Sequence, residues 1–182
     1  MSDARPAADE RLAAVIARAG YMMGENVDRA WSRDVAIAWE GFLELSRVLR
    51  RDAEGLLEPY GGLSVSMLGI MGRLARAERL TLRQTQLAEA MGLSVSRVSR
   101  VIDTLEGRGL VERHACPTDA RATNVTLTRD GQALTRSAQD TVFAFVDERF
   151  VAPLDDEELA TLAAVFARLL RGVDGSSEGA CG

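Results

Sequence analysis

The sequence predicts a mainly α-helical protein with one small β-hairpin and with long helices towards both ends. Three observations support this fold class. Apolar residues recur every three or four positions over most of the 182 residues, which is the period of an amphipathic helix. A glycine separates two short helical patterns near residue 92. Soon afterwards, apolar and polar residues alternate, which is the period of a strand.

The first third of the chain is expected to hold an N-terminal extension and one long helix. We assign residues 1–32 to the extension, which would be disordered over residues 1–8 and helical over 9–23. Apolar residues at helical spacing then predict a long helix over 33–58. The stretch EPYGG ends this helix, because Pro59 and the glycines after it cannot extend a helix cheaply.

The middle of the chain is expected to fold as a lobe over residues 63–128. A short helix over 64–75, with a serine suited to its N-cap, is followed by the extended stretch ERLTL. Two more short helices are expected over 83–91 and 95–106, with Gly92 in the tight turn between them. The alternating segments LVERHA and TNVTLT, joined by the turn-forming CPTDAR, then predict a β-hairpin.

Two long helices are expected after the hairpin. Thr128 is suited to cap the first, which would run to about residue 150. Asp155 is suited to cap the second, whose first turn is rich in acidic residues that favour the positive end of a helix. The Gly- and Ser-rich tail over 172–182 is expected to be disordered.

The outer helices carry more apolar residues than one small domain needs to bury. We therefore expect the helices over 33–58 and 129–171 to bury one another across a homodimer, as dimerisation helices of one domain over 33–171. Packing of these helices within a single chain is the alternative.

The stretch VSRVSRVIDTLE separates two kinds of side chain when it is placed on a helix. The apolar stripe, which we expect to face the core, consists of Val95, Val98, Ile102 and Leu105. The opposite side carries small hydroxyls and arginines, which can bond to base edges and phosphates. With the glycine turn before it and the hairpin after it, this helix predicts a winged helix-turn-helix, whose second helix enters the major groove. The candidate DNA-binding residues on this helix are Ser94, Ser96, Arg97, Ser99 and Arg100.

Composition argues against most classes of enzyme. All 22 basic residues are arginine, so chemistry that requires lysine is excluded, and His114 is the only histidine for a nucleophilic relay. No HExxH, CxxC or GxGxxG pattern is present, and we expect neither a metal nor a cofactor. No apolar run approaches the roughly 20 residues of a membrane helix. The distant Cys116 and Cys181 do not suggest a disulfide framework, so we expect a cytoplasmic protein.

The net charge of −5 hides a division along the chain. Residues 72–136 contain 11 arginines against 7 acidic residues, a local charge of +4. The rest of the chain contains 11 arginines against 20 acidic residues, a local charge of −9. A basic segment between two acidic ends is a candidate surface for a polyanion such as DNA. Arginines that are merely solvated would give the same counts.

The run LTLRQTQLAEAMGLSVSRVSRVIDTLEGRGLVERHACPTDARATNVTLTRDG resembles the MarR family of bacterial transcription regulators, and the resemblance extends over about residues 36–170. Its most specific pieces are QLAEAMGLS, VSRVIDTLEGRGLVER, the wing pattern Asp-x-Arg at Asp119 and Arg121, and LTRDG. The resemblance implies a homodimer that reads a roughly palindromic operator in double-stranded DNA. It also implies that Arg121 contacts the minor groove while Asp119 helps to hold it. Arg113, on the strand before the tip, is a further candidate for DNA contact.

The resemblance also implies an effector site between the DNA-binding lobe and the dimerisation helices. The expected function is therefore that of a repressor which a small-molecule ligand releases from its operator. Apolar and aromatic side chains in this region suit a small hydrophobic or aromatic effector, whereas ordinary core packing is the alternative. The candidate lining residues are Trp39, Phe42, Met67, Ile70 and Met71.

Two other functions stay open at the level of the sequence. Cys116 lies in the wing, where Arg113 and His114 could supply the positive surroundings that a reactive thiolate needs. Oxidation of this thiol would then regulate DNA binding directly, whereas a cysteine without a role is the alternative. A winged helix that binds proteins instead of DNA is the second possibility. The arginines at 97, 100 and 121 favour DNA over this module.

Overall fold

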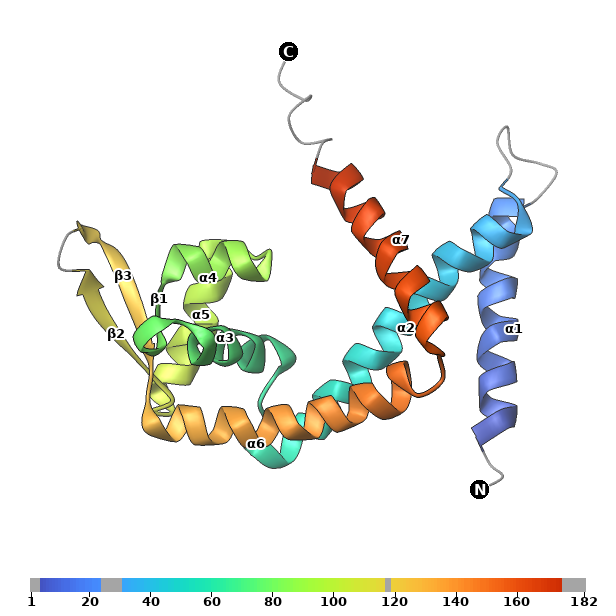
Figure 1. The fold of residues 1–182 in the computed structure, drawn as a ribbon. Helices are drawn as coiled ribbons and strands as arrows, with labels where there is room; N and C mark the ends of the chain where they lie inside the picture. Colours follow the sequence, from blue (N-terminus) through green and yellow to red (C-terminus); the bar gives the residue numbers. More distant parts are fainter. Residues whose placement is uncertain (1–3, 24–30, 117–118, 175–182) are drawn as a thin grey trace, which may run out of the picture. The chain divides into compact units, whose positions relative to one another are not determined.

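The computed structural model of the chain describes residues 4–23, 31–116 and 119–174. Contacts divide the chain into two compact units, Met1–Val65 and Ser66–Gly182. The first unit holds two helices, and the second holds the remaining helices and a small sheet (Figure 1). This division groups the last two helices with the sheet, whereas the sequence led us to group them with the helix over 33–58.

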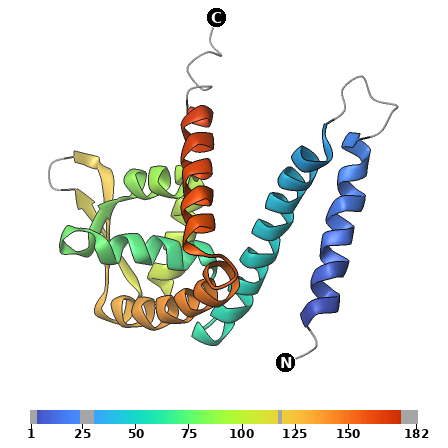
Figure 2. The ribbon, with the colours of Figure 1, turned by 45° about the vertical axis from the view of Figure 1, so that its right-hand side comes forward.

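In the first unit, α1 (Ala4–Met23) runs alongside α2 (Arg33–Leu57) in the opposite direction, as Figures 1 and 2 both show. The side chain of Ser32 caps α2 by accepting a hydrogen bond from the N–H of Val35 at 3.4 Å. Arg18 of α1 lies 3.1 Å from a carboxylate oxygen of Glu44 on α2. An ion pair therefore links α1 to α2.

Helix α1 begins at Ala4, so the expectation of disorder over residues 1–8 is wrong from that residue onwards. Alanine has the highest helix propensity and predominates just before the expected start, and a proline in the first turn costs no hydrogen bond. Residues 1–3 and 24–30 lie outside the described residues.

Among the described residues, the second unit contains three helices of the predicted lobe, α3, α4 and α5, followed by two long helices. In chain order its regular elements are α3 (Val65–Arg76), β1 (Thr81–Arg83), α4 (Gln84–Met91), α5 (Val95–Gly107), β2 (Val111–Cys116), β3 (Asp119–Leu127), α6 (Arg129–Val146) and α7 (Asp156–Asp174). Short turns of other helix types lie at Glu58–Tyr60, Glu78–Leu80 and Asp147–Val151. The expected helices and hairpin are all present, and α7 continues to Asp174, beyond the predicted start of the tail.

The sheet has three antiparallel strands in the order β1-β3-β2. Strand β2 pairs with β3 as the expected hairpin, with Val111 opposite Leu127. The expectation that the whole stretch ERLTL is extended is wrong for Glu78–Leu80, which form a short helical turn. Strand β1 begins after this turn and pairs with the other edge of β3, placing Thr81 opposite Thr126. The hydroxyl oxygens of these two threonines lie 2.8 Å apart and link the strands. The sheet thereby connects the start of α4 to the wing.

The core of the second unit lies where α3, α4 and α5 come together with the sheet (Figures 1 and 2). Apolar side chains from each of these elements are fully buried there, which is the main source of favourable free energy in a fold of this size. These residues are Ile70, Met71, Leu74, Leu87, Val98, Ile102, Leu105, Val111 and Val125.

The two caps predicted for the last helices are both present. The hydroxyl of Thr128 accepts a hydrogen bond from the N–H of Gly131 at 3.0 Å and donates one to the carbonyl oxygen of Gly109 at 2.8 Å. Before α7, Asp155 and Glu158 form a reciprocal pair, in which each backbone N–H donates to the carboxylate of the other residue, at 3.0 and 2.8 Å. These caps satisfy donors that a helix start would otherwise leave unpaired.

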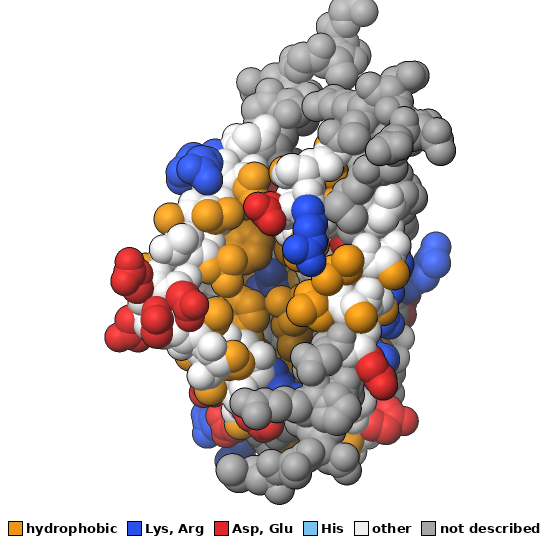
Figure 3. Space-filling model, turned by 90° about the vertical axis from the view of Figure 1, so that its right-hand side faces the viewer, with side chains coloured by type: hydrophobic (Ala, Val, Ile, Leu, Met, Phe, Trp, Pro, Cys, Tyr) orange, Lys and Arg blue, Asp and Glu red, His pale blue; other side chains and the backbone are white. Residues whose placement is uncertain are grey.

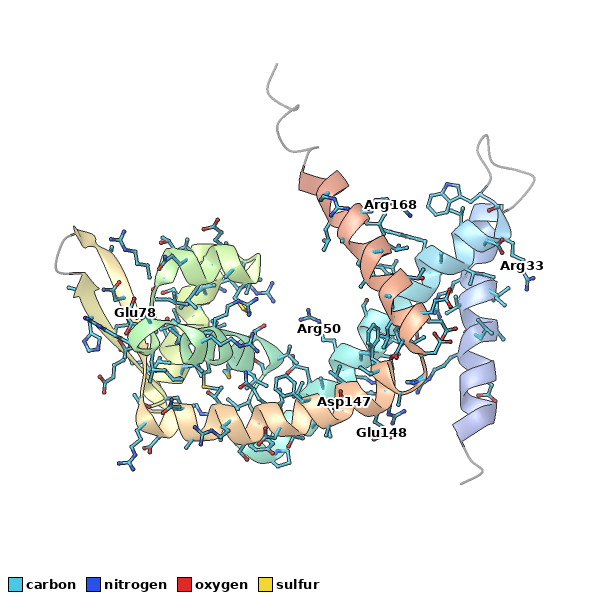
Figure 4. The ribbon with its side chains drawn as sticks, in the orientation of Figure 1. Arg33, Arg50, Glu78, Asp147, Glu148 and Arg168 are labelled. Atoms are coloured by element: carbon cyan, nitrogen blue, oxygen red, sulfur yellow. The ribbon has the colours of Figure 1, made fainter. Side chains whose placement is uncertain are left out.

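Helix α6 ends at Val146, and the chain continues through a π turn at Asp147–Val151. Asp147 begins this turn and Arg168 lies far along α7, where Figure 4 labels them.

Over the residues that the structure describes, no helix combines the length and the low polarity needed to cross a lipid bilayer.

Candidate DNA-binding surface

A tight turn sets the direction of α5 with respect to α4. Gly92 adopts φ 60° and ψ 34°, the left-handed conformation that glycine accepts without steric cost, and its N–H donates to the carbonyl oxygen of Glu89 at 3.0 Å. Two residues later, the hydroxyl of Ser94 accepts a hydrogen bond from the N–H of Arg97 at 3.3 Å and caps α5. The predicted helix, glycine turn and second helix are thus found as expected.

Helix α5 buries one side and exposes another. Val98, Ile102 and Leu105 are fully buried, as the apolar stripe predicts. Ser96, Arg97 and Arg100 are exposed on the outer side, where no other described element covers them. An exposed row of small hydroxyls and arginines on a capped helix can approach a DNA groove closely.

Val95 is the exception to the predicted stripe. Its side chain is 46% exposed, so the expectation that it faces the core is wrong. Val95 is the first residue of α5, and the core that covers Val98 one turn later does not extend as far as the start of the helix. A residue at the end of an apolar stripe can thus project into solvent although its spacing matches the buried ones.

The guanidinium of Arg113 joins strand β2 to α5. Its two terminal nitrogens lie 2.6 Å from the carboxylate of Glu106 and 2.7 Å from that of Asp103, and one of them donates to the carbonyl oxygen of Ser99 at 3.0 Å. The backbone N–H of Arg113 also donates to Glu106, at 3.0 Å. These bonds hold the wing against α5, and we call the four residues Ser99, Asp103, Glu106 and Arg113 the wing clamp.

The electrostatics of the wing clamp match its geometry. The hydrogen bond from the Arg113 side chain lowers the pKa of Glu106 below its ordinary value, and the backbone hydrogen bond of Arg113 lowers it further. The Arg113 side chain itself is only 21% exposed. The sequence made Arg113 a candidate for DNA contact. Its side-chain donors bond to protein atoms instead, an arrangement that suits a role in positioning the wing. Ser99, another candidate, is half-buried beside it.

The wing tip is described only in part. Strand β3 begins at Asp119, which pairs with Cys116, so the backbone of Asp119 and Arg121 lies in the strand. The side chains of Cys116, Asp119 and Arg121 lie outside the described residues, as do Pro117 and Thr118. The roles expected for these three side chains therefore stay predictions.

Two further arginines of the basic segment hold the lobe together, and the sequence analysis did not single them out. Arg73 on α3 donates to the carbonyl oxygen of Gly69 at 3.0 Å and to that of Ala90, near the end of α4, at 2.7 Å. Arg108, just after α5, approaches the sulfur of Met67 on α3 at 4.0 Å. Both contacts fix the two helices of the turn against α3. Spacing in the sequence gives no signal for such long-range contacts.

The candidate effector residues divide between the two units. Ile70 and Met71 are fully buried in the core of the second unit, which favours core packing for these two. Met67 on the same helix is half-buried. In the first unit, Trp39 and Phe42 are 47% and 48% exposed on α2. Among the described residues, no three His, Cys, Asp or Glu side chains come together to hold a metal ion.

The fold is similar to that of known proteins. The model of the MarR family matches residues 62–122, which include α3, both helices of the turn and most of the wing. Among solved structures, the chain is similar to AbsC of Streptomyces coelicolor, a MarR family transcriptional regulator, with 29% identity and a TM-score of 0.77 over 81% of this chain and 99% of that one. It is also similar to Sco3205 of the same organism in complex with DNA, with 24% identity and a TM-score of 0.76 over 81% of this chain and 92% of that one.

A third similar structure is that of CouR from Rhodococcus jostii RHA1 bound to p-coumaroyl-CoA, with 24% identity and a TM-score of 0.63 over 72% of this chain and 90% of that one. Each of the three likenesses covers more than two thirds of this chain. The match to the MarR family model over residues 62–122 and the likeness to AbsC support a MarR-family winged-helix regulator, and the likenesses to Sco3205 and CouR support the fold.

Proposed function

We propose that the protein is a homodimeric repressor that binds a pseudo-palindromic operator and is released from it by a small-molecule ligand. The observation that carries this proposal is the exposed outer side of α5, where Ser96, Arg97 and Arg100 lie free of other described elements. A helix that follows a glycine turn and stands beside a three-stranded wing has the form that enters a major groove.

The proposed DNA contacts fall into two groups. On α5, Arg97 and Arg100 would bond to guanine or to phosphate, and the hydroxyls of Ser94 and Ser96 would bond to either. In the wing, Arg121 would enter the minor groove, where the negative potential of a narrow groove attracts arginine. We propose that Arg113 and Ser99 act on the DNA indirectly, because the wing clamp sets the distance between the wing and α5.

The proposed dimer rests on apolar side chains that each unit leaves in contact with solvent, and Figure 3 shows hydrophobic side chains gathered at the surface. On α7, Leu169 and Leu170 are 58% and 64% exposed, and Phe143 on α6 is 52% exposed. A hollow of about 420 Å³ runs along α7 and is lined by Leu154, Leu162 and Val165 among others. Exposed apolar surface of this kind is typical of interfaces between subunits.

The proposed effector is a small hydrophobic or aromatic molecule. Trp39 and Phe42 present large exposed aromatic surfaces on α2, which suit such a ligand. CouR, which is similar in fold, is bound to p-coumaroyl-CoA, whose acyl group is aromatic. We expect a panel of small aromatic compounds to contain members that lower the affinity for the operator, and replacement of Phe42 by alanine to remove that response without removing DNA binding.

Selection of sequences from a random DNA pool tests the proposed function. The purified protein is compared with a variant that carries Arg97→Ala and Arg121→Ala. We expect the protein to enrich a motif with two related half-sites about one helical turn apart, and the variant to enrich none. If the folded dimer enriches no sequence, even after any bound ligand has been removed by unfolding and refolding, the proposal is wrong and a protein-binding winged helix takes its place.

A further inference from the structure

A small hollow lies where the start of α4, the start of α5 and strand β3 meet. Its volume is about 100 Å³, which exceeds the roughly 10–15 Å³ that one water molecule needs. A methyl group therefore fits into it. The residues that line it are Arg83, Gln84, Thr85, Val95, Ala122 and Thr123. Among these described lining residues, Val95 has the one large apolar side chain.

The position of Val95 on α5 directs it to the side of the helix that faces the wing. Val95, Ser99 and Asp103 are spaced by four residues and so share one flank of the helix. Arg113 of the wing bonds to Ser99 and to Asp103, so this flank faces the wing. Val95 lies at the N-terminal end of the flank, and the N-terminal residues of a recognition helix are those that meet base edges.

The core of the second unit does not cover the side chain of Val95. Its side chain is 46% exposed, whereas Val98, Ile102 and Leu105 of the same stripe are fully buried. Leaving this apolar surface in water gives up a favourable burial term. The free energy would be recovered if an apolar group covered Val95 in the complex.

We propose that Val95 reads the 5-methyl group of a thymine in each operator half-site. This inference rests on the proposed function, because it places a major groove against α5. The thymine methyl is the apolar feature that a base pair presents in the major groove, and apolar side chains contact it. Cytosine lacks this methyl group, so the contact selects thymine.

Deoxyuridine differs from thymidine only in the missing methyl group, so it isolates this contact. Burying one such group stabilises a complex by about 0.8 kcal/mol, which corresponds to about a fourfold change in affinity for each half-site. Each thymine of the selected operator is therefore replaced in turn by deoxyuridine, and the affinity of each duplex is measured. We expect a loss of about fourfold at one position of the half-site and smaller changes at the others.

Variants of Val95 assign the loss to this side chain. We expect Val95→Ala to bind the thymine and deoxyuridine duplexes with a ratio near one, and Val95→Ile to retain the fourfold ratio. Val35→Ala is the matched control, because Val35 is a 49% exposed valine on α2, outside the winged helix. This control should keep the fourfold ratio. Thermal unfolding of each variant confirms that it is folded.

The outcomes separate this inference from the proposed function. A fourfold ratio that disappears only in Val95→Ala supports the reading of a methyl group. If Val95→Ala keeps the ratio, or if no thymine position responds in the native protein, the inference is wrong although the protein binds its operator. If the protein binds no operator at all, the proposed function fails, and this inference fails with it.

Discussion

Replacement of Arg113 by glutamine tests whether this arginine positions the wing or contacts DNA. The change removes ion pairs with Asp103 and Glu106 at 2.7 and 2.6 Å and a hydrogen bond to the carbonyl oxygen of Ser99 at 3.0 Å. The carboxylates are 62% and 40% exposed, so each ion pair contributes only about 0.2–1 kcal/mol. With about 1 kcal/mol for the hydrogen bond, the loss of stability is about 2 kcal/mol.

A loss of that size lowers the Tm by about 4–8 °C in a protein of this length. DNA affinity should fall as well, because the wing and α5 lose their fixed spacing. The slope of log K against log salt concentration should stay unchanged, because Arg113 neutralises no phosphate. Arg97→Ala serves as the comparison and should lower the slope by about one if Arg97 contacts a phosphate.

The opposite pattern would refute this reasoning. If Arg113→Gln leaves the Tm unchanged and lowers the salt slope by about one, then Arg113 leaves the wing clamp and bonds to a phosphate in the complex. Arg76→Gln is the control for loss of a positive charge elsewhere in the second unit, since Arg76 is exposed at the end of α3. It should change neither the Tm nor the slope to a comparable extent.

Three further changes test stability, pH dependence and assembly. Gly131→Ala should lower the Tm by several degrees, because its Cβ would collide with the carbonyl oxygen of Leu110, whereas Gly107→Ala, with open space around it, should not. Glu106→Gln should destabilise the protein at neutral pH. Because folding lowers the pKa of Glu106, the difference in stability between the native protein and the variant should disappear as the pH falls below the ordinary value of 4.5. Thermal unfolding at several pH values measures this difference. Leu169→Glu should yield monomers in sedimentation experiments, and a stable dimer of this variant would exclude α7 from the proposed interface.

Local chemistry explains why most of the fold could be predicted. A helix start depends on a few adjacent residues, so Thr128 and Asp155 were recognisable as caps without any knowledge of the fold. The glycine turn at Gly92 depends equally on one position and its neighbours. The apolar stripe of α5 placed Val98 and Ile102 correctly, because helical periodicity reports which residues share a side.

Contacts between distant segments explain what could not be predicted. Periodicity showed that Val95 shares the stripe of Val98, but it did not show where the surrounding core ends. The side chain of Arg113 donates hydrogen bonds to Glu106 and Ser99 on α5, which lie 7 and 14 positions earlier in the sequence. No local sequence pattern reveals these contacts. The sequence left a pocket and ordinary core packing open for Ile70 and Met71, and their complete burial favours the core.

Only some arginines of the basic segment, residues 72–136, are exposed to solvent in the structure. The count of 11 arginines against 7 acidic residues in residues 72–136 treats every arginine as part of one anion-binding surface. In the structure, Arg73 and Arg113 direct their donors to carbonyl oxygens and carboxylates of the lobe. Arg97 and Arg100 are exposed on α5. The salt dependence of DNA binding should therefore follow the few arginines that face solvent, so a slope that matches the full count would contradict the structural roles of Arg73 and Arg113.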